Sequence, residues 1–344
     1  MEWSHGLAVN ASADNAPGAR KLFAGASCWI VTDGKAGDET QCLGLAQALG
    51  LDAQRRVVRP GRLFAALAPR GPIDPAEAPS KPGSPIAPPY PDVLIASGRR
   101  AVPYLRHVRK ASGGRTFTIF LKDPRMDTSV ADVVWIPQHD ARRGANAIAT
   151  VAGPHLVSAE ALARARQAPD PRIEALPAPR VALLVGGRSR HHSFRERDAR
   201  AVSDIVSTIL ASGASVMITP SRRTTGDVTT ALQEACALAP DRAFLWASGA
   251  NPYLAMLAHA DFIVVTADST NMVGEAAATA APVFVYEPSG GHPKITRYLD
   301  ALASAGRIRR WNGRLEPWDC APYDDTPRIA EAVAAHYARW RDKN

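Results

Sequence analysis

The sequence predicts an α/β protein of two domains with mainly parallel sheets, and two observations lead to this prediction. Short apolar runs alternate with helical patterns, and each run has the length and composition of a buried parallel strand. The 344 residues are also enough for two domains that each have a core of their own. A proline-rich stretch, residues 166–179, separates the two halves and is the predicted linker.

The first predicted domain spans residues 22–165 and follows a tail. Residues 1–21 are small and polar and lack the basic start and apolar core of a secretory signal, so we expect a disordered tail. Strands are predicted at 28–32 and 92–96. Between residues 68 and 91 lie nine prolines without periodicity, which predicts a long surface loop.

A polar loop joins the first predicted strand to a helix that includes residues 43–49 and that Gly50 can end. The loop matches neither Gly-x4-Gly-Lys-Ser/Thr nor Gly-x-Gly-x-x-Gly, the glycine patterns typical of nucleotide-binding loops. Its candidate site residues are Asp33, Gly34, Lys35, Gly37, Asp38, Glu39 and Gln41. Two interpretations stay open: these residues act on a ligand, or Asp38 caps the helix and the glycines only serve the turn.

The second predicted domain, residues 180–322, repeats a strand, a polar turn and a helix three times. The strands are predicted at 181–185, 216–219 and 262–265, and a further strand at 282–286. The helices are predicted at 198–211, 228–237 and 272–280.

The turns that follow these strands carry small polar and basic residues. In open α/β sheets such turns line one crevice at the carboxyl ends of the strands, and helix N-termini and arginines there attract phosphate. We therefore expect an anionic ligand, although an ordinary capped crossover helix with a surface glutamate would also explain the last turn. The candidate donor-binding residues are Gly186, Gly187, Ser189, Ser221, Arg222, Arg223, Asp268, Ser269, Asn271, Met272 and Glu275.

The C-terminal segment, residues 323–344, is predicted to end in an amphipathic helix over 325–340. Apolar side chains recur there at helical spacing, namely Ile329, Val333, Tyr337 and Trp340.

Six short motifs together resemble the mitochondrial-fission ELM-type family, which includes bacterial members. The resemblance covers the chain from about Ala26 onward, and its most specific motif is the first. The motifs are Trp29-Ile-Val-Thr-Asp-Gly-Lys-Ala-Gly-Asp-Glu-Thr-Gln41, Ser97-Gly-Arg-Arg100, Gly186-Gly187, Thr219-Pro-Ser-Arg-Arg223, Asp268-Ser-Thr-Asn-Met272 and Gly290-Gly-His-Pro-Lys294.

This resemblance implies a GT-B-like fold, in which two Rossmann-like domains face a central cleft, and a sugar-transferase activity. The Asp-Ser-x-x-Met-x-x-Glu pattern is similar to the donor-binding helix of GT-B glycosyltransferases, which implies that Glu275 holds a ribose. The last helix is expected to pack back on the first domain. Further loops expected at the cleft contain Gly98, Arg99, Arg100, Gly291, His292 and Lys294.

The predicted reaction is attack of an acceptor hydroxyl on the anomeric carbon of a nucleotide-sugar, with Asp33, Asp38 and Glu39 as candidate bases. The nucleotide-sugar is a co-substrate; no further cofactor is expected. No cysteine, histidine or Asp-x-Asp spacing predicts a metal site. The alternative function is a non-catalytic, membrane-associated adaptor that keeps the fold, as the family's name suggests.

The formal net charge is +8, and eight of the basic residues lie between Ser97 and Arg125 beside a single acid, Asp123. Such a cluster fits either an anionic membrane surface, which the acceptor lipid could share, or a solvated basic face. Nucleic acid is not expected, because no recognition motif accompanies the charge. Scattered cysteines and the lack of any apolar run of ~20 residues predict a cytoplasmic protein, peripheral at most on the membrane.

Overall fold

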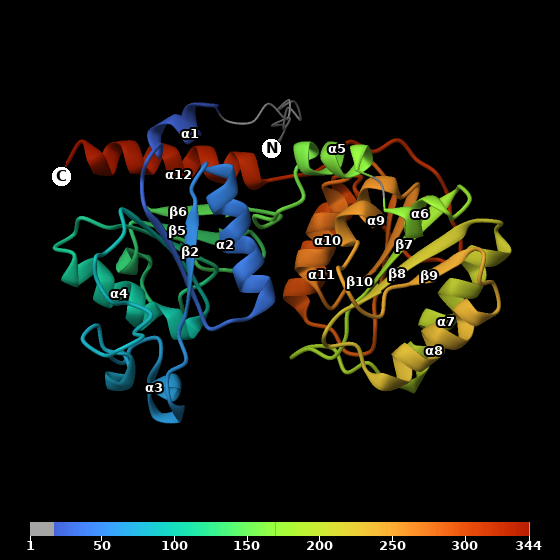
Figure 1. Ribbon diagram of the computed structural model, residues 1–344, viewed down its shortest axis with the longest axis horizontal. Coiled ribbons are helices and arrows are strands. Elements are labelled where there is room, and N and C mark those ends of the chain that lie inside the picture. Colours follow the sequence, from blue (N-terminus) through green and yellow to red (C-terminus); the bar gives the residue numbers. More distant parts are fainter. Residues whose placement is uncertain (1–16, 169, 344) are drawn as a thin grey trace, which may run out of the picture.

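The computed structural model describes residues 17–168 and 170–343. It contains two six-stranded sheets, one in each half of the chain, that lie side by side (Figure 1). The strand orders are β2-β1-β3-β4-β5-β6 and β12-β11-β10-β7-β8-β9, and all neighbouring strands run parallel. The predicted α/β class with parallel sheets is confirmed.

The first sheet and the elements around it occupy the N-terminal half. Its strands are β1 Cys28–Thr32, β2 Ala53–Val57, β3 Val93–Ser97, β4 Phe117–Leu121, β5 Val133–Pro137 and β6 Ala147–Thr150. The helices are α1 Pro17–Leu22, α2 Ala36–Ala48, α3 Arg62–Leu67 and α4 Val102–Ala111, with short 3-10 turns at η1 Pro75–Glu77, η2 Arg99–Ala101 and η3 Thr128–Val130.

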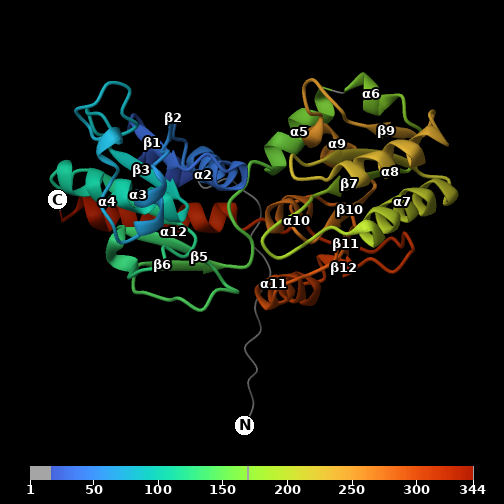
Figure 2. The same ribbon diagram turned by 90° about the horizontal axis from the view of Figure 1, so that it is seen from below.

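The second sheet is formed by β7 Arg180–Val185, β8 Ser215–Pro220, β9 Ala243–Leu245, β10 Phe262–Thr266, β11 Val283–Tyr286 and β12 Ile308–Arg310. Its helices are α5 Ala159–Gln167, α6 Pro171–Glu174, α7 Glu196–Ala211, α8 Gly226–Ala237, α9 Tyr253–His259, α10 Thr270–Ala277 and α11 Pro293–Ser304. The last helix is α12 Thr326–Arg341. Figure 2 shows helices on both faces of each sheet.

The inner strands are apolar along their whole length because helices cover both faces of the sheet. All five residues of β1, β3, β4 and β5 are buried. The edge strand β2 is instead polar and half-exposed, with the sequence Ala-Gln-Arg-Arg-Val. Each sheet therefore has two apolar clusters, one on each face.

The disordered tail predicted for residues 1–21 is contradicted over residues 17–21. Residues 1–16 lie outside the described residues, but α1 begins at Pro17. Phe23, which follows α1, is buried and stacks on Tyr337 of α12 with ring centroids 4.3 Å apart. Helix α12 packs on α1 and α2, and its residues Ile329 and Val333 belong to an apolar cluster of the first sheet. The stacked rings therefore hold the segment after α1 against the C-terminal helix.

The chain crosses to the second sheet upstream of the predicted linker. Helix α5 packs against α9, and Val157 and Leu162 belong to the second core. The proline-rich stretch 166–179 contains α6, with Ile173 and Leu176 buried. The reason is that Ile173 and Leu176 belong to the apolar cluster on the face of the second sheet that α9 also covers, rather than bridging solvent.

The proline-rich region 68–91 is irregular, as predicted, but it is packed rather than loose. Ile86 is fully buried in this region. The carboxylate of Asp74 accepts hydrogen bonds from the amides of Gly61 (2.7 Å) and Ala76 (2.9 Å), and Tyr104 donates to Glu77. These bonds replace the backbone pairing that a strand or helix would supply.

Candidate functional site

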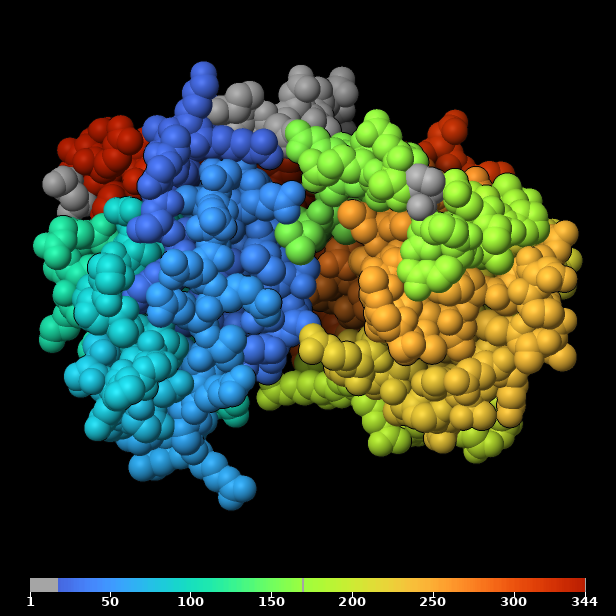
Figure 3. Space-filling model, in the orientation of Figure 1, coloured from blue at the N-terminus to red at the C-terminus, as the bar shows by residue number. Residues whose placement is uncertain are grey.

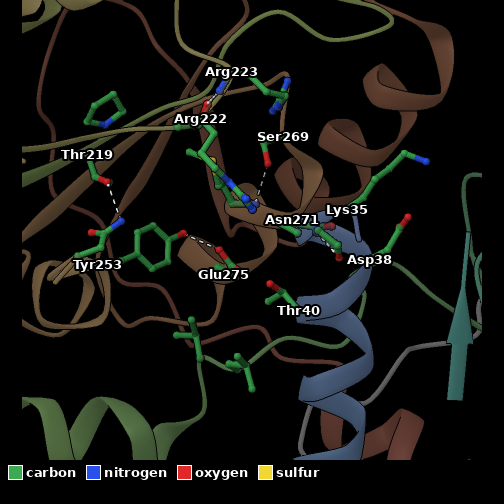
Figure 4. Close-up of a pocket in the computed structure, with 18 of the residues that line it drawn as sticks. Lys35, Asp38, Thr40, Thr219, Arg222, Arg223, Tyr253, Ser269, Asn271 and Glu275 are labelled. Atoms are coloured by element: carbon green, nitrogen blue, oxygen red, sulfur yellow. Dashed lines mark hydrogen bonds between the residues drawn. The ribbon is translucent and has the colours of Figure 1, made fainter. Parts of the chain in front are cut away.

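A cavity of about 1000 Å³ opens between the two halves of the chain (Figures 3 and 4). One wall is the N-terminal end of α2, and the other is formed by the turns after β8 and β10 and by the start of α9. Its lining includes Gly34, Lys35, Ala36, Gly37, Asp38, Thr40, Lys122, Leu156, Ser221, Arg222, Arg223, Asn251, Tyr253, Ser269, Asn271, Met272 and Glu275.

A second, smaller cavity of about 390 Å³ adjoins the first. Both cavities are lined by Thr40, Lys122, Asn271 and Glu275. The smaller one also receives side chains from the turns after β7 and β11. The two cavities are therefore parts of one cleft between the sheets.

A contact between α2 and α10 divides the two cavities. Nε2 of Gln41 donates to Oδ1 of Asn271 at 3.0 Å, and Nδ2 of Asn271 donates to the carbonyl of Gly37 at 3.0 Å. A Cβ atom on Gly37 would lie 2.6 Å from that same Nδ2. A glycine is required here because the two helices approach so closely.

The N-terminus of α10 points into the larger cavity. Oγ of Ser269 accepts a hydrogen bond from the amide of Met272 at 3.4 Å and so caps the helix. The amides of Thr270 and Asn271 donate to no acceptor within the described chain. Free amides at a helix N-terminus attract anions.

Arg222 projects into the same cavity from the turn after β8 (Figure 4). Its guanidinium makes no hydrogen bond or ion pair with any residue that the structure describes, and the side chain is exposed. It therefore supplies an unpaired planar donor group close to the α10 N-terminus.

Glu275 is buried one turn inside α10, with 8% of its surface exposed. Tyr253 of α9 donates a hydrogen bond of 2.5 Å to its Oε2. Burial raises the pKa of Glu275, against the opposing effects of the Tyr253 hydrogen bond and of nearby His155. Burial and the Glu275 carboxylate also raise the pKa of Tyr253. Tyr253 was not among the predicted site residues, because no local motif singles it out.

Asp268 lines the smaller cavity, but its carboxylate is engaged by groups of the protein itself, and its donor-binding role stays a prediction. Its Oδ2 accepts hydrogen bonds from the amide of Gly187 (3.0 Å) and from Nη2 of Arg223 (2.8 Å), and its Oδ1 accepts one from Thr266 (2.6 Å). The carboxylate thus accepts from the turns after β7 and β8 and from the end of β10, and it holds these segments together.

The glycines after β7, Gly186 and Gly187, also take part in these contacts between the segments at the ends of the strands. The amide of Gly186 donates to Oγ1 of Thr266 at 2.7 Å, so neither its N–H nor that of Gly187 is free for a phosphate. A Cβ on Gly186 would lie 2.1 Å from Asp268, and one on Gly187 would lie 1.9 Å from the carbonyl oxygen of Arg223. Neither glycine lines the two cavities.

The three candidate bases are separated by the start of α2. The helix begins at Ala36, so Asp38, Glu39 and Gln41 lie on it rather than in a loop. Asp38 does not cap the helix; its Oδ1 is 2.5 Å from Nζ of Lys122. It lines the larger cavity, whereas Glu39 pairs with Arg55 of β2 at 2.6 Å, outside both cavities.

Asp33 pairs with Lys35 at 2.7 Å, and only 2% of the Asp33 side chain is exposed. Its Oδ1 is buried and has no hydrogen-bond partner in the described part of the chain. Asp33 lies behind the cavity wall formed by Gly34 and Lys35 and does not line either cavity.

Lys122 lines both cavities, although it was predicted only as a member of the basic cluster 97–125. It directly follows β4, at the carboxyl end where ligand-binding turns are expected. Its φ of 80° is a left-handed conformation that a lysine adopts at a cost of about 1–3 kcal/mol. Its position after a buried strand is the signal that could have found it.

The turn after β3 contributes less to the cleft than predicted. Gly98 has a φ of 92° and lies directly against Asp38: a Cβ at this position would lie 3.3 Å from Oδ2 of that residue. Arg99 points away and donates to the carbonyls of Ala65 (2.8 Å) and Ala68 (2.6 Å), which lack partners at the end of α3. Arg100 is exposed outside both cavities.

His292 and Lys294, which follow β11, line the smaller cavity together with Ser189, which follows β7. His292 caps α11 by accepting from the amide of Lys294 at 3.1 Å, and its ring lies 4.3 Å from that of His191. Gly291 donates from its amide to the carbonyl of His191 at 2.6 Å. Lys294 pairs with Asp140, which follows β5, at 2.6 Å, and so links the two halves of the chain again.

The predicted basic cluster does not form one face. Arg109 pairs with Asp132 at 2.7 Å, Lys122 pairs with Asp38, and Arg125 lines the smaller cavity. Among residues 17–168 and 170–343, no helix is long and apolar enough to cross a membrane. The same part of the chain contains no group of three His, Cys, Asp or Glu side chains placed to hold a metal ion.

Two parallel α/β sheets that face a cleft, with the last helix packed on the first sheet, define a GT-B-like fold. The chain belongs to the mitochondrial fission ELM1 family, whose family model matches residues 36–337. Both the fold and the family that the sequence indicated are confirmed.

Two curated relatives match parts of the chain. The mitochondrial fission protein ELM1 of Arabidopsis thaliana is 26% identical over 275 residues, which is 72% of this chain and 64% of the plant protein. An uncharacterised protein of Rickettsia prowazekii is 29% identical over 161 residues, 44% of this chain and 45% of that protein. The matched part of this chain thus spans less than two thirds of either relative.

Solved structures are similar in fold. A candidate UDP-N-acetylglucosamine 2-epimerase from Listeria monocytogenes superimposes with a TM-score of 0.51 at 13% identity, over 91% of this chain and 97% of that one. MurG from Acinetobacter baumannii, also 13% identical, has a TM-score of 0.47 over 92% of this chain and 95% of MurG.

Proposed function

We propose that this chain is a glycosyltransferase that binds a nucleotide-sugar in the cleft between its two sheets. The observation that carries the proposal is the larger cavity, where Arg222 and the capped N-terminus of α10 face the same space as buried Glu275. A cation and free amides suit the diphosphate of a nucleotide, and a buried carboxylate suits the hydroxyls of its ribose.

The donor's diphosphate would lie against the α10 N-terminus and Arg222, with Ser221 and Ser269 as further donors. Oε2 of Glu275 is occupied by Tyr253, but Oε1 makes no hydrogen bond with a described residue. That oxygen is free to accept from a ribose hydroxyl. Arg222 and the helix dipole would stabilise the leaving diphosphate, so the proposal includes no cofactor.

The transfer would proceed by attack of an acceptor hydroxyl on the anomeric carbon of the sugar. The new oxygen–carbon bond forms as the bond from that carbon to the diphosphate breaks, and the diphosphate leaves with the electron pair. The hydroxyl proton passes to a carboxylate of the enzyme. Of the three predicted bases, Asp38 is best supported, because it lines the cavity opposite Ser269 and Arg222 while Asp33 and Glu39 do not.

A thermal-shift screen against nucleoside diphosphates and their sugars tests the proposal. A ligand at 100 times its Kd stabilises the fold by about 2.7 kcal/mol, which is a readily measured shift in Tm. We expect one nucleotide base to give the largest shift. No shift with any nucleotide at about millimolar concentration would favour the non-catalytic adaptor instead.

A further inference from the structure

A small patch on the first half of the chain combines exposed leucines with arginines. Leu63 and Leu67, one turn apart on α3, are 65% and 48% exposed. They are two of the four most exposed large apolar side chains among the described residues. Because residues four apart share one face of a helix, the two leucines form one small apolar surface beside Arg62.

The chain around α3 carries positive charge without acids. Between Asp52 and Asp74 there are five arginines and no Asp or Glu, and Arg59, Arg62 and Arg70 among them form no ion pair with a described residue. The nearest carboxylates, of Asp74 and Glu77, are occupied by backbone amides and by Tyr104.

Helix α4 extends this basic surface. Arg106 donates to the carbonyl of Arg70 at 3.0 Å, which joins α4 to the chain after α3. Arg70, Arg106, His107 and Lys110 line one shallow hollow there. Burial and the charge of Lys110 lower the pKa of His107, so the arginines and Lys110 alone carry the positive charge at neutral pH.

We infer that the α3 patch, defined as Leu63 and Leu67 with Arg62, Arg70, Arg106 and Lys110, docks on an anionic lipid bilayer. The leucines would enter the boundary between headgroups and acyl chains while the cations contact anionic headgroups. Of the basic cluster 97–125, this patch contains only Arg106 and Lys110, because Arg109 and Lys122 are paired with acids and Arg125 lines the cleft. The inference does not depend on sugar transfer.

The shape of the patch favours a bilayer over an acidic protein. Helix α3 has six residues and lies at the lower end of the first half in Figure 1, away from α12 and from the second sheet. A projecting tip with two leucines fits between lipid headgroups, whereas a stable protein interface needs about 800 Å² of matched surface on each partner.

Flotation of the full chain with liposomes tests this inference. We expect binding to liposomes that contain phosphatidylglycerol, with little binding to pure phosphatidylcholine and loss at high salt. The double variant Leu63→Ser/Leu67→Ser should bind at least ~10-fold more weakly. Removal of the charge at Arg62 or at Lys110 should each weaken binding by ~5-fold.

Matched controls separate the patch from general effects. Leu238→Ser removes the most exposed leucine, at 82%, on the other half of the chain, and Arg314→Ala removes an exposed arginine there. Both should bind like the parent. Three results would each overturn the inference: equal binding by the leucine double variant, equal binding to neutral liposomes, or no binding to any liposome. The last of these would indicate an acidic protein as the partner of the patch instead.

Discussion

Tyr253 donates a hydrogen bond of 2.5 Å to the buried carboxylate of Glu275, and this pair forms part of the wall of the larger cavity. The two side chains come from different elements, α9 and α10, so their contact fixes the carboxylate relative to the turn after β9. A short bond of this kind to a carboxylate is stronger than one between neutral groups.

Glu275→Gln should weaken the binding of a nucleoside diphosphate. The amide keeps an acceptor for Tyr253, but it replaces a charged acceptor for the ribose by a neutral group. We expect a loss of roughly 10-fold in Kd, measured by calorimetry. Tyr253→Phe is the companion variant, because it leaves the carboxylate buried without its donor; it should lower stability by about 1–3 kcal/mol. Unchanged affinity in Glu275→Gln would remove this residue from the donor site.

The raised pKa of Glu275 predicts how stability depends on pH. The folded protein holds a proton on this group at pH values where the unfolded chain has lost it. Its favourable contribution is therefore complete below the ordinary glutamate pKa and is lost as the pH rises through the raised value.

Urea unfolding of the parent and of Glu275→Gln isolates this group from other carboxylates such as Asp325, whose pKa burial also raises. As the pH rises from the ordinary glutamate pKa of about 4.3 through the raised pKa of Glu275, the parent should lose stability relative to the variant. A difference between the two proteins that does not change with pH would contradict this prediction.

Asp38→Asn should lower the transfer rate far more than Glu39→Gln. Asp38 faces the cavity, and removal of a general base typically costs 10²- to 10⁴-fold in kcat, so we expect ~10²-fold or more with donor affinity nearly unchanged. Glu39 is paired with Arg55 outside the cavities and serves as the matched control. The comparison is made by steady-state kinetics once a donor and acceptor are known; equal effects of both substitutions would exclude Asp38 as the base.

Gly187→Ala should destabilise the fold rather than weaken ligand binding alone. A Cβ there would overlap the backbone carbonyl of Arg223, and overpacking of this kind costs about 1–3 kcal/mol. Gly226→Ala is the control, since no atom lies within 4 Å of a Cβ at that position. Chemical denaturation measures both. A stable Gly187→Ala protein that cannot bind nucleotide would instead restore the phosphate-binding interpretation of this turn.

The strands and the turns after them could be predicted because their signals are local. The structure has β1 at the predicted residues, and the turns after β8 and β10 bring Ser221, Arg222, Ser269 and Glu275 to one cavity. Apolar runs of strand length and the rule that ligand-binding turns follow strands were sufficient for this.

The features of the site that could not be predicted depend on contacts between segments far apart in the sequence. Asp268 carries the same residue type that a ligand site would use, but donors from the turns after β7 and β8 saturate it. Arg99 is turned away from the cleft by the unpaired carbonyls at the end of α3. Helix α2 begins at Ala36 after Lys35, which provides no side-chain cap, so no start signal was present in the sequence.

The most direct test of the account is a calorimetric titration with uridine, guanosine, cytidine and thymidine diphosphates. The titration compares the parent with Arg222→Ala and with the distant control Arg314→Ala. We expect one nucleotide to bind the parent and the control equally, and the loss of the unpaired guanidinium in Arg222→Ala to weaken that binding by about 10- to 100-fold. Equal affinity in all three proteins, or no binding by any nucleotide, would contradict a nucleotide-sugar site in this cleft.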